Sequence, residues 1–315
     1  MKIEKIFTLS AARLKTALRS EMMSLGYSAI HNEKKFLYAE GNAPYLLVAH
    51  LDTVHTELPS IICYSKDDKY MMSPQGIGGD DRCGVYIILQ LIERLPFLPY
   101  VVFTMDEEIG GVGAKAFAAY ADKNVIPELK YIVEYDRKGS KDCVFYSCDN
   151  QDFVDFVEKF GFVKSHGTFS DISIIAPKLG VAAVNLSSGY YNPHTSHEYV
   201  SMDDMNNIIT KSLEMLCTEC NTFEYIEGKY SYSYGSDRTV SVSLVPAGMV
   251  YASDYYGDYC LNQDGEIVID ENGNYYRYNK WYGDVTLIRS DVYLADENCV
   301  PTYDKDNAKV MSRYY

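Results

Sequence analysis

The sequence lacks an apolar segment long enough to cross a membrane, since no run approaches the roughly 18 residues of a transmembrane helix. Its first 20 residues also lack the apolar stretch, followed by small residues, that is typical of a secretory signal peptide. They predict a short strand-like segment and then an amphipathic helix. We therefore expect no membrane partner and a cytoplasmic location.

Positive charge is scarce in this chain. Lysine and arginine together number 29 against 44 aspartates and glutamates, and the formal net charge is −15. Binding to a phosphate backbone requires a basic face, so this balance argues against nucleic acid as a partner. The acidity is typical of a soluble, well-hydrated surface.

The eight cysteines do not have the spacing of a disulfide framework, and reduced thiols fit a cytosolic protein. Cys217 and Cys220 form a Cys-x-x-Cys pair, a spacing that structural zinc sites use. This pair lies in a helical pattern, and only the single cysteines Cys260 and Cys299 follow it. Ordinary helix cysteines are the favoured interpretation, and a structural zinc site is the alternative.

Residues 1–221 show strand-like and helix-like patterns in alternation. Continuous apolar runs at 44–50 and 99–103 are typical of strands inside a parallel sheet, and 83–95 predicts a buried helix. Further helices are expected at 9–26, 112–121, 151–160 and 203–217, further strands at 34–41, 130–135 and 181–186, and a hairpin at 61–73. This order indicates an α/β fold with a mixed, mostly parallel sheet covered by helices on both faces.

The composition changes at about residue 222, and 16 of the 30 tyrosines lie in the last 95 residues. Asp264-Gly265 and Asn272-Gly273 separate strand-like runs and predict successive hairpins. We expect residues 222–315 to form a small antiparallel β appendage to a catalytic domain of residues 1–221. Half-buried sheet surface is the favoured role of its tyrosines, and a surface for a peptide or a second copy, with Trp281, is the alternative.

Histidines and carboxylates follow the predicted strands. His50 and Asp52 end one apolar run, Glu107 and Glu108 end the next, and Asp136 follows a third. Functional groups of such sheets collect at the carboxyl ends of the strands. Side chains of these types can bind two divalent metals and leave one carboxylate free to move protons.

Two of these motifs have more than one interpretation when taken alone. Asp80 and Asp81 lie in a glycine-rich bend before the buried helix, where an aspartate can cap the helix or bridge two cations. Glu107 and Glu108 are adjacent and point in opposite directions on extended backbone, so one can bind a metal while the other stays free as a base. A solvated acidic loop is the alternative for that pair.

The last two ligand positions have rivals nearby in the sequence. Asp136 could instead form a surface ion pair with Arg137, and Glu134 lies on the same strand face. His194 and His197 share a loop that contains Pro193, which argues against both histidines binding one metal from a helix. We expect one histidine ligand from this loop.

These segments, AHLDTV (49–54), GGDDRCGV (78–85), TMDEEIG (104–110), EYD (134–136) and the later His-Thr-x-x-Glu, are similar in order and type to the co-catalytic dinuclear zinc exopeptidases. That clan includes leucyl-type metallo-aminopeptidases, peptidase T and the glutamyl and tetrahedral aminopeptidases. The resemblance covers about residues 40–215 and implies a three-layer exopeptidase core.

The resemblance also implies the ligands of two divalent metal ions, zinc above all, with cobalt or manganese as alternatives. His50, Asp80 and Asp136 would bind the first ion, and Asp80 would bridge to the second, which Glu108 and His194 complete. Carboxylate and imidazole ligands suit all three metals.

Three further features follow from the same resemblance. Glu107 would be the general base, and Asp52 would orient His50. The Asp80–Asp81 peptide bond would be cis. Ser170 and Asp171 would lie near the site, with no role assigned.

The chain departs from the clan members that carry a separate lid domain, because only 57 residues lie between Asp136 and His194. This spacing favours a compact aminopeptidase that acts on short peptides. A deacylase of small N-acyl compounds with the same metals, and a peptide-binding protein without catalysis, are the alternatives. Assembly into a homo-oligomer is left open.

Overall fold

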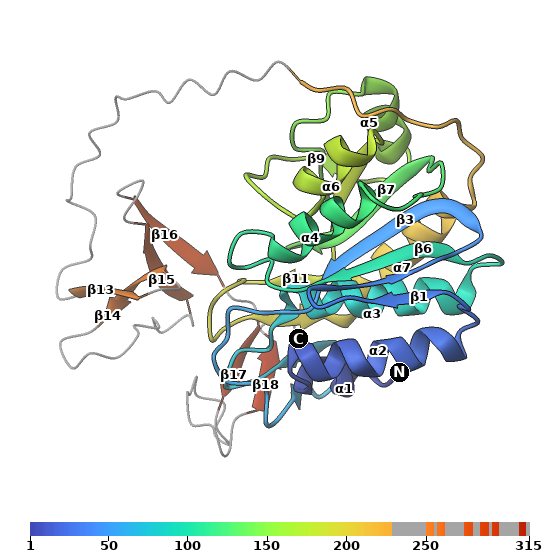
Figure 1. Cartoon of the computed structure of the whole chain (residues 1–315). Coiled ribbons are helices and arrows are strands. Elements are labelled where there is room, and N and C mark those ends of the chain that lie inside the picture. The colour runs from blue at the N-terminus through green and yellow to red at the C-terminus, as the bar shows by residue number, and fades with distance from the viewer. Residues whose placement is uncertain are drawn as a thin grey trace.

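The structure is a computed structural model that describes residues 1–228 continuously and six strands beyond them (Figure 1). Four of these strands form one antiparallel sheet, and two form an antiparallel pair: β13 (Val250–Asp254), β14 (Gly257–Leu261), β15 (Asn274–Asn279) and β16 (Asp284–Arg289), then β17 (Val292–Ala295) and β18 (Lys309–Ser312). The turns expected at Asp264-Gly265 and Asn272-Gly273, and Trp281, lie outside the described residues. The domain boundary at 221 and 222 stays a prediction.

An eight-stranded sheet forms the centre of residues 1–228, in the order β1-β2-β6-β3-β7-β10-β8-β9. Its inner pairs β6–β3, β3–β7 and β7–β10 are parallel, whereas β1–β2, β2–β6 and β10–β8 are antiparallel. The expected mixed sheet is thereby confirmed. The strands are β1 (Ile30–Asn32), β2 (Phe36–Ala39), β3 (Ala43–His50), β6 (Pro99–Thr104), β7 (Tyr131–Arg137), β8 (Asp142–Val144), β9 (Val163–Lys164) and β10 (Ala183–Ser187).

Helices cover both faces of this sheet (Figure 1). Along β3, Leu47 and Ala49 belong to one buried core and Leu46 and Val48 to the other, as the twofold alternation of strand side chains requires. Five helices complete the first core: α1 (Ile3–Thr8), α2 (Ala11–Ser24), α3 (Gly79–Arg94), α5 (Gln151–Glu158) and α7 (Met202–Cys217). Two complete the second: α4 (Val112–Ala121) and α6 (Ile172–Leu179). The three-layer α/β fold is therefore confirmed.

The first residues correct one expectation, because Ile3–Thr8 form the helix α1 and not a strand. Ile3, Ile6 and Phe7 follow the three- and four-residue spacing of a helix face, and Ile6 and Phe7 are buried against the first core. Arg82 of α3 fixes this helix by donating hydrogen bonds to the carbonyl oxygens of Ile6 and Leu9. No helix among the described residues is both long and apolar enough to cross a membrane.

A second, four-stranded sheet lies beside the start of α3. Its order is β11-β12-β5-β4, with β4 (Cys63–Tyr64), β5 (Tyr70–Met72), β11 (Tyr190–Tyr191) and β12 (Tyr199–Ser201). The expected hairpin at 61–73 is confirmed by the β4–β5 pair. Because β12 pairs with β5, the loop that carries His194 is brought next to the segment that leads into α3.

Helix α3 packs closely on β7 at Gly84. A Cβ atom at this position would lie 2.4 Å from the carbonyl oxygen of Tyr135 and 2.5 Å from Asp81 Oδ1. Real Cβ atoms do not approach backbone this closely, so the helix must shift to accommodate any side chain. The absence of a side chain at Gly84 sets how near α3 comes to the carboxyl end of β7.

We therefore expect Gly84→Ala to lower the free energy of unfolding. Overpacking costs about 1–3 kcal/mol, which is more than the gain in helix propensity of up to about 1 kcal/mol from alanine. Urea unfolding monitored by circular dichroism measures the change. Glu93→Ala, on the exposed side of the same helix, is the control, with a change within about 0.5 kcal/mol. Equal stability of the two variants would contradict the packing argument.

Candidate metal centre

Three predicted ligands meet at the carboxyl ends of β3 and β7. His50 is the last residue of β3, Asp136 lies near the end of β7, and Asp80 precedes the regular part of α3. His50 Nε2 lies 3.0 Å from Asp80 Oδ1 and 3.4 Å from Asp136 Oδ1. All three ligand atoms fall within 4.8 Å of one another.

A second group forms on the other oxygen of Asp80. His194 Nε2 lies 3.1 Å from Asp80 Oδ2 and 3.4 Å from Glu108 Oε1. These three ligand atoms also lie within 4.8 Å of one another. The carboxylate of Asp80 therefore stands between the two groups, with one oxygen directed at each histidine.

The loop that follows β6 brings both of its glutamates to His50. Glu107 and Glu108 form a third group with His50, again within 4.8 Å. Asp52 fixes this loop, because its two carboxylate oxygens accept hydrogen bonds from the main-chain N–H groups of Glu107 and Glu108, each at 3.2 Å. Asp52 thus holds Glu107, the predicted general base, and Glu108 in place through their main-chain N–H groups.

Asp52 was expected to orient His50 through its carboxylate. In the structure His50 Nδ1 lies 3.1 Å from the main-chain oxygen of Asp52 and 3.6 Å from its carboxylate Oδ1. The main-chain oxygen is the nearer acceptor, and the carboxylate is used mainly by the loop of Glu107. Asp52 therefore contacts His50 through its main-chain oxygen and the loop of Glu107 through its carboxylate.

Asp81 is placed differently from its neighbour. The peptide bond between Asp80 and Asp81 is cis, as the resemblance implied. Asp81 is fully buried, and its oxygens accept from the main-chain N–H of His50, at 3.2 Å, and of Gly84, at 3.0 Å. The bond to Gly84 is of the capping type, so the two interpretations of the Asp-Asp pair apply to different residues: Asp81 caps, and Asp80 faces both histidines.

The rival residues lie outside the three groups. Glu134 is buried and accepts a hydrogen bond from Ser170. His197 is also buried, and burial lowers its pKa to about 4. Of the two candidate histidines, the structure brings His194 to the site.

The two histidines of the site are surrounded by negative charge. Burial by itself lowers the pKa of His50, but the neighbouring carboxylates of Asp136, Asp52 and Asp80 outweigh it and raise that pKa well above its usual value. For His194 burial is likewise outweighed by Asp80 and Glu108, and the pKa is raised to about 11. Both imidazoles are therefore held next to groups that attract a cation.

The carboxylates repel one another and are poorly hydrated. Burial, reinforced by the charge of Asp80, raises the pKa of Asp136 well above its usual value. Burial also raises the pKa of Glu107 to about 7, although the positive charge of His50 opposes this. For Asp80 burial acts in the same direction, but the hydrogen bonds from His194 and His50 prevail and lower its pKa.

This donor set fits divalent metal ions. Imidazole nitrogen and carboxylate oxygen are the ligands of zinc, cobalt and manganese. Two ligands bound about 2.0–2.1 Å from one tetrahedral zinc lie about 3.3 Å apart, close to the 3.0–3.4 Å found between the paired atoms of each group. Glu108 Oε1 is buried and accepts no hydrogen bond from the described residues, as expected of an atom left for a metal.

Sequence reasoning missed Asn185, a fully buried residue of β10. Its Oδ1 accepts from the main-chain N–H of Asp136 at 2.9 Å, and its Nδ2 donates to the hydroxyl of Tyr146, also at 2.9 Å. A signal was present in the sequence, since asparagine interrupts the apolar run 181–186, and a buried amide in a central strand must find partners.

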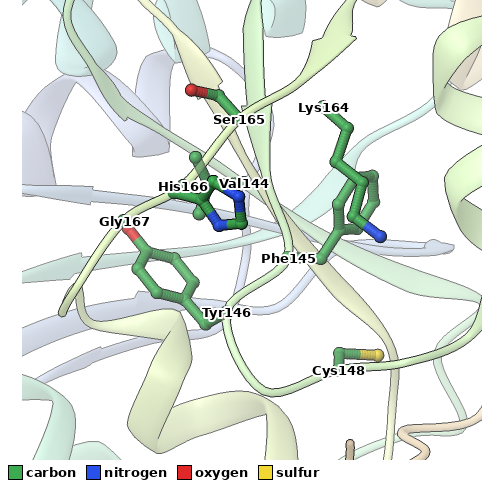
Figure 2. Close-up of a pocket in the computed structure, with 8 residues that line it drawn as sticks. All are labelled: Val144, Phe145, Tyr146, Cys148, Lys164, Ser165, His166 and Gly167. Atoms are coloured by element: carbon green, nitrogen blue, oxygen red, sulfur yellow. The ribbon is translucent and has the colours of Figure 1, made fainter. Parts of the chain in front are cut away.

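Tyr146, the partner of this asparagine, lines a pocket of about 130 Å³ (Figure 2). The ring of Tyr146 forms one wall, and its hydroxyl connects the pocket to Asn185 and so to Asp136. The other walls come from the end of β8 and the residues after it, and from β9 and the segment after it, whose His166 carbonyl accepts a hydrogen bond from Arg137. The lining residues are Val144, Phe145, Tyr146, Cys148, Lys164, Ser165, His166 and Gly167.

Comparison with known proteins supports the fold. No protein-family model matches the chain. Among solved structures, aminopeptidase PepT of Bacillus cereus superposes with a TM-score of 0.55 at 14% identity, covering 68% of this chain and 96% of that one. A tripeptidase of Staphylococcus aureus gives 0.55 at 13% identity, covering 68% and 95%, and an aminopeptidase of the archaeon Desulfurococcus kamchatkensis gives 0.52 at 16%, covering 70% and 94%. At these identities the likeness establishes the fold, and the fold implied by the exopeptidase resemblance is confirmed.

One curated sequence is also similar over a short segment. A probable carboxypeptidase of Emericella nidulans is 33% identical over 89 residues, which make up 26% of this chain and 21% of that protein. The match spans about a fifth of the curated relative.

Asp171, which is not a proposed ligand, provides a further test of the burial argument. It is fully buried, and its Oδ2 accepts a hydrogen bond from Thr104. Burial raises its pKa to about 6, although the Thr104 hydrogen bond opposes this. The folded state therefore keeps a proton that the unfolded chain releases near pH 4, so the free energy of unfolding falls as the pH rises from about 4 to about 6.

We expect Asp171→Asn to abolish this fall in the free energy of unfolding with rising pH. Relative to the wild type, the metal-free variant should gain about 2 kcal/mol in free energy of unfolding between pH 4.5 and pH 7.5. Urea unfolding of both proteins at the two pH values measures the difference. Carboxylates that do not interact with Asp171 titrate alike in both proteins and cancel in the comparison, whereas Glu107 and Glu134 also lose a repelling charge. An equal pH dependence in the two would show that Asp171 ionises normally.

Proposed function

We propose that this protein is a dinuclear metallo-exopeptidase, an aminopeptidase that removes N-terminal residues from short peptides. The observation that carries the proposal is the carboxylate of Asp80, whose two oxygens face two separate groups of imidazole and carboxylate ligands. A single carboxylate shared in this way is suited to bridging two cations. The solved structures of similar fold, described as aminopeptidases and a tripeptidase, support the same assignment.

In this proposal His50, Asp80 and Asp136 hold one cation, and Asp80, Glu108 and His194 hold the other. The ions would be zinc, with cobalt or manganese as alternatives. When bound, such ions would polarise the scissile carbonyl and lower the pKa of a bound water molecule. The ion pairs that the histidines now make with these carboxylates would give way to bonds with the metals.

Glu107 is the proposed general base. It shares the cluster of His50 and Glu108 but is left over once the ligands of both cations are assigned. Its carboxylate can accept the proton of the attacking water and deliver it to the departing amine. Asp52 keeps Glu107 at this place by binding its main-chain N–H, so the side chain stays free to move the proton.

The pocket beside Tyr146 is joined to Asp136 by hydrogen bonds through Asn185. With only 57 residues between Asp136 and His194, no separate lid domain is inserted at this point, which favours short substrates with a free N-terminus. Assembly into a homo-oligomer and a cytoplasmic location remain predictions.

Cleavage of matched peptides tests the bond and the end attacked. Free tripeptides, their N-acetylated forms and their C-terminal amides are incubated with metal-free protein to which zinc, cobalt or manganese has been added. We expect release of the N-terminal residue from the free and the amidated peptides and little cleavage of the acetylated ones. Cleavage of acetylated substrates alone would favour a deacylase, and release of the C-terminal residue would favour a carboxypeptidase.

Glu107→Gln tests the assignment of the base. The amide cannot accept the proton of water, so turnover should fall by at least roughly 100-fold. The number of bound metal ions should stay that of the wild type, because Glu107 is not a proposed ligand. Steady-state kinetics and metal analysis of the same preparation measure both quantities.

Glu108→Gln is the matched comparison on the adjacent residue. It removes a proposed ligand, so it should lower the affinity for one of the two metals as well as turnover. Near-normal turnover of Glu107→Gln would show that Glu107 is not the general base. Loss of metal from that variant would make it a ligand and not the base.

A further inference from the structure

Glu198 is a fully buried acid whose carboxylate joins three separate segments. Its Oε2 accepts from His55 Nε2 at 2.8 Å and from the main-chain N–H of Gly78 at 2.9 Å. Its Oε1 accepts from the main-chain N–H of Asp80 at 3.0 Å. One side chain thus binds the loop after β3, the segment before α3 and, through its own backbone, the loop that carries His194.

These bonds act on the two residues that define the second group of ligands. Glu198 binds the backbone of Asp80 directly, and it lies four residues after His194 in the same loop. The contact between Asp80 Oδ2 and His194 Nε2, at 3.1 Å, closes the same ring of interactions. The relative position of these two side chains therefore depends on where Glu198 holds the two loops.

The glycines of this segment are fitted to the same arrangement. A Cβ atom on Gly76 would lie 2.2 Å from the ring of His55, and one on Gly79 would lie 3.2 Å from Glu198 Oε1 and 2.5 Å from Tyr190 Cβ. The loop comes this close only because both positions lack a side chain. His55 and Glu198 are therefore enclosed by the segment that they hold.

Two of the three ligands of the first group, His50 and Asp136, are held by other means, and only the shared Asp80 is bound by Glu198. His50 and Asp136 lie on the central strands β3 and β7. Their main-chain N–H groups are bound by Asp81 and Asn185, at 3.2 and 2.9 Å. Neither bond involves Glu198 or His55.

We propose that Glu198, supported by His55, is a positioning residue that sets the site of the second cation by fixing Asp80 relative to His194. This inference rests on the proposed dinuclear centre. It predicts an asymmetric effect of losing the Glu198 carboxylate: the site of Asp80, Glu108 and His194 weakens, whereas the site of His50, Asp80 and Asp136 is largely kept.

Glu198→Gln is the sharpest variant, because it keeps the size of the side chain. The carboxylate accepts three hydrogen bonds through two oxygens, whereas a glutamine offers one oxygen and turns an NH2 group toward the remaining donor. At least one of the N–H groups of Gly78 and Asp80, or that of His55, then loses its acceptor. The two loops should separate without a cavity being created.

Binding of cobalt to the metal-free protein measures the effect, followed by visible absorption and calorimetry. We expect the wild type to bind two ions. In Glu198→Gln the affinity for one ion should fall by about 10- to 100-fold, the range found when partners of metal ligands are removed, and the other should change less than about threefold. Equal affinities in variant and wild type, or an equal loss at both sites, would overturn the proposal.

Glu40→Gln is the matched control, because Glu40 forms a histidine–glutamate pair with His31, at 2.7 Å, on the β1–β2 hairpin. It should leave both affinities at the wild-type values. Urea unfolding of the metal-free proteins accompanies the titration, since a purely structural defect lowers stability without distinguishing the two sites.

His55→Gln provides a second variant if Glu198→Gln does not fold. It leaves Glu198 its bonds to Gly78 and Asp80, and the glutamine NH2 group can replace the imidazole donor. We expect a smaller loss confined to the same site, and a loss at the other site would contradict the proposal. A wild-type protein that binds no cobalt would refute the proposed function itself, which separates that failure from failure of this inference.

Discussion

The structure of the site depends on the burial of several carboxylates around two imidazoles. Asp80 is balanced by His50 and His194, but Asp136 and Glu107 are left with raised pKa values because burial and mutual repulsion disfavour their charged forms. Such a cluster is costly unless cations compensate it, and a rigid sheet is needed to keep it together. The parallel strands β3 and β7 supply that rigidity, since their carboxyl ends are fixed by the hydrogen bonds of the sheet and by helices on both faces.

The two halves of the centre are supported by different parts of the fold. His50 and Asp136 stand on central strands, whereas Glu108 and His194 stand on loops. Loops are positioned less tightly than strands, so they require additional hydrogen bonds to hold ligands at a defined distance. Asp52 provides these for the loop of Glu108, and the proposed role of Glu198 is the equivalent for the loop of His194. This difference is the physical reason for expecting the two cations to respond unequally to changes outside the ligands.

Much of this arrangement could be predicted from the sequence. The apolar runs that lead to His50 and Asp136 predict buried strands, and the residues at the carboxyl ends of such strands lie at the same edge of the sheet. The helix at 3–8 was missed since six residues carry little periodic information, and its identity depends on packing against α3 through Arg82. The separate roles of Asp80 and Asp81 depend on backbone geometry, which adjacent identical residues do not reveal. The partners of Glu198 could not be predicted either, because two of them are main-chain groups and all three lie more than a hundred residues away in the sequence.

One pattern unites the residues that surround the proposed ligands. Four of the five ligands have their main-chain N–H bound by a side-chain oxygen of a residue that is not a ligand: His50 by Asp81, Asp80 by Glu198, Glu108 by Asp52 and Asp136 by Asn185. These bonds fix the backbone of each of the four ligands, and Asn185 also donates from Nδ2 to the ligand carboxylate itself, at Asp136 Oδ2 and 3.4 Å. The same bonds supply uncharged donors to the buried Asp81 and Glu198 and to the half-buried Asp52. Main-chain N–H donors bound in this way do not compete with the metals for the ligand carboxylates, as a basic side chain in the same place would.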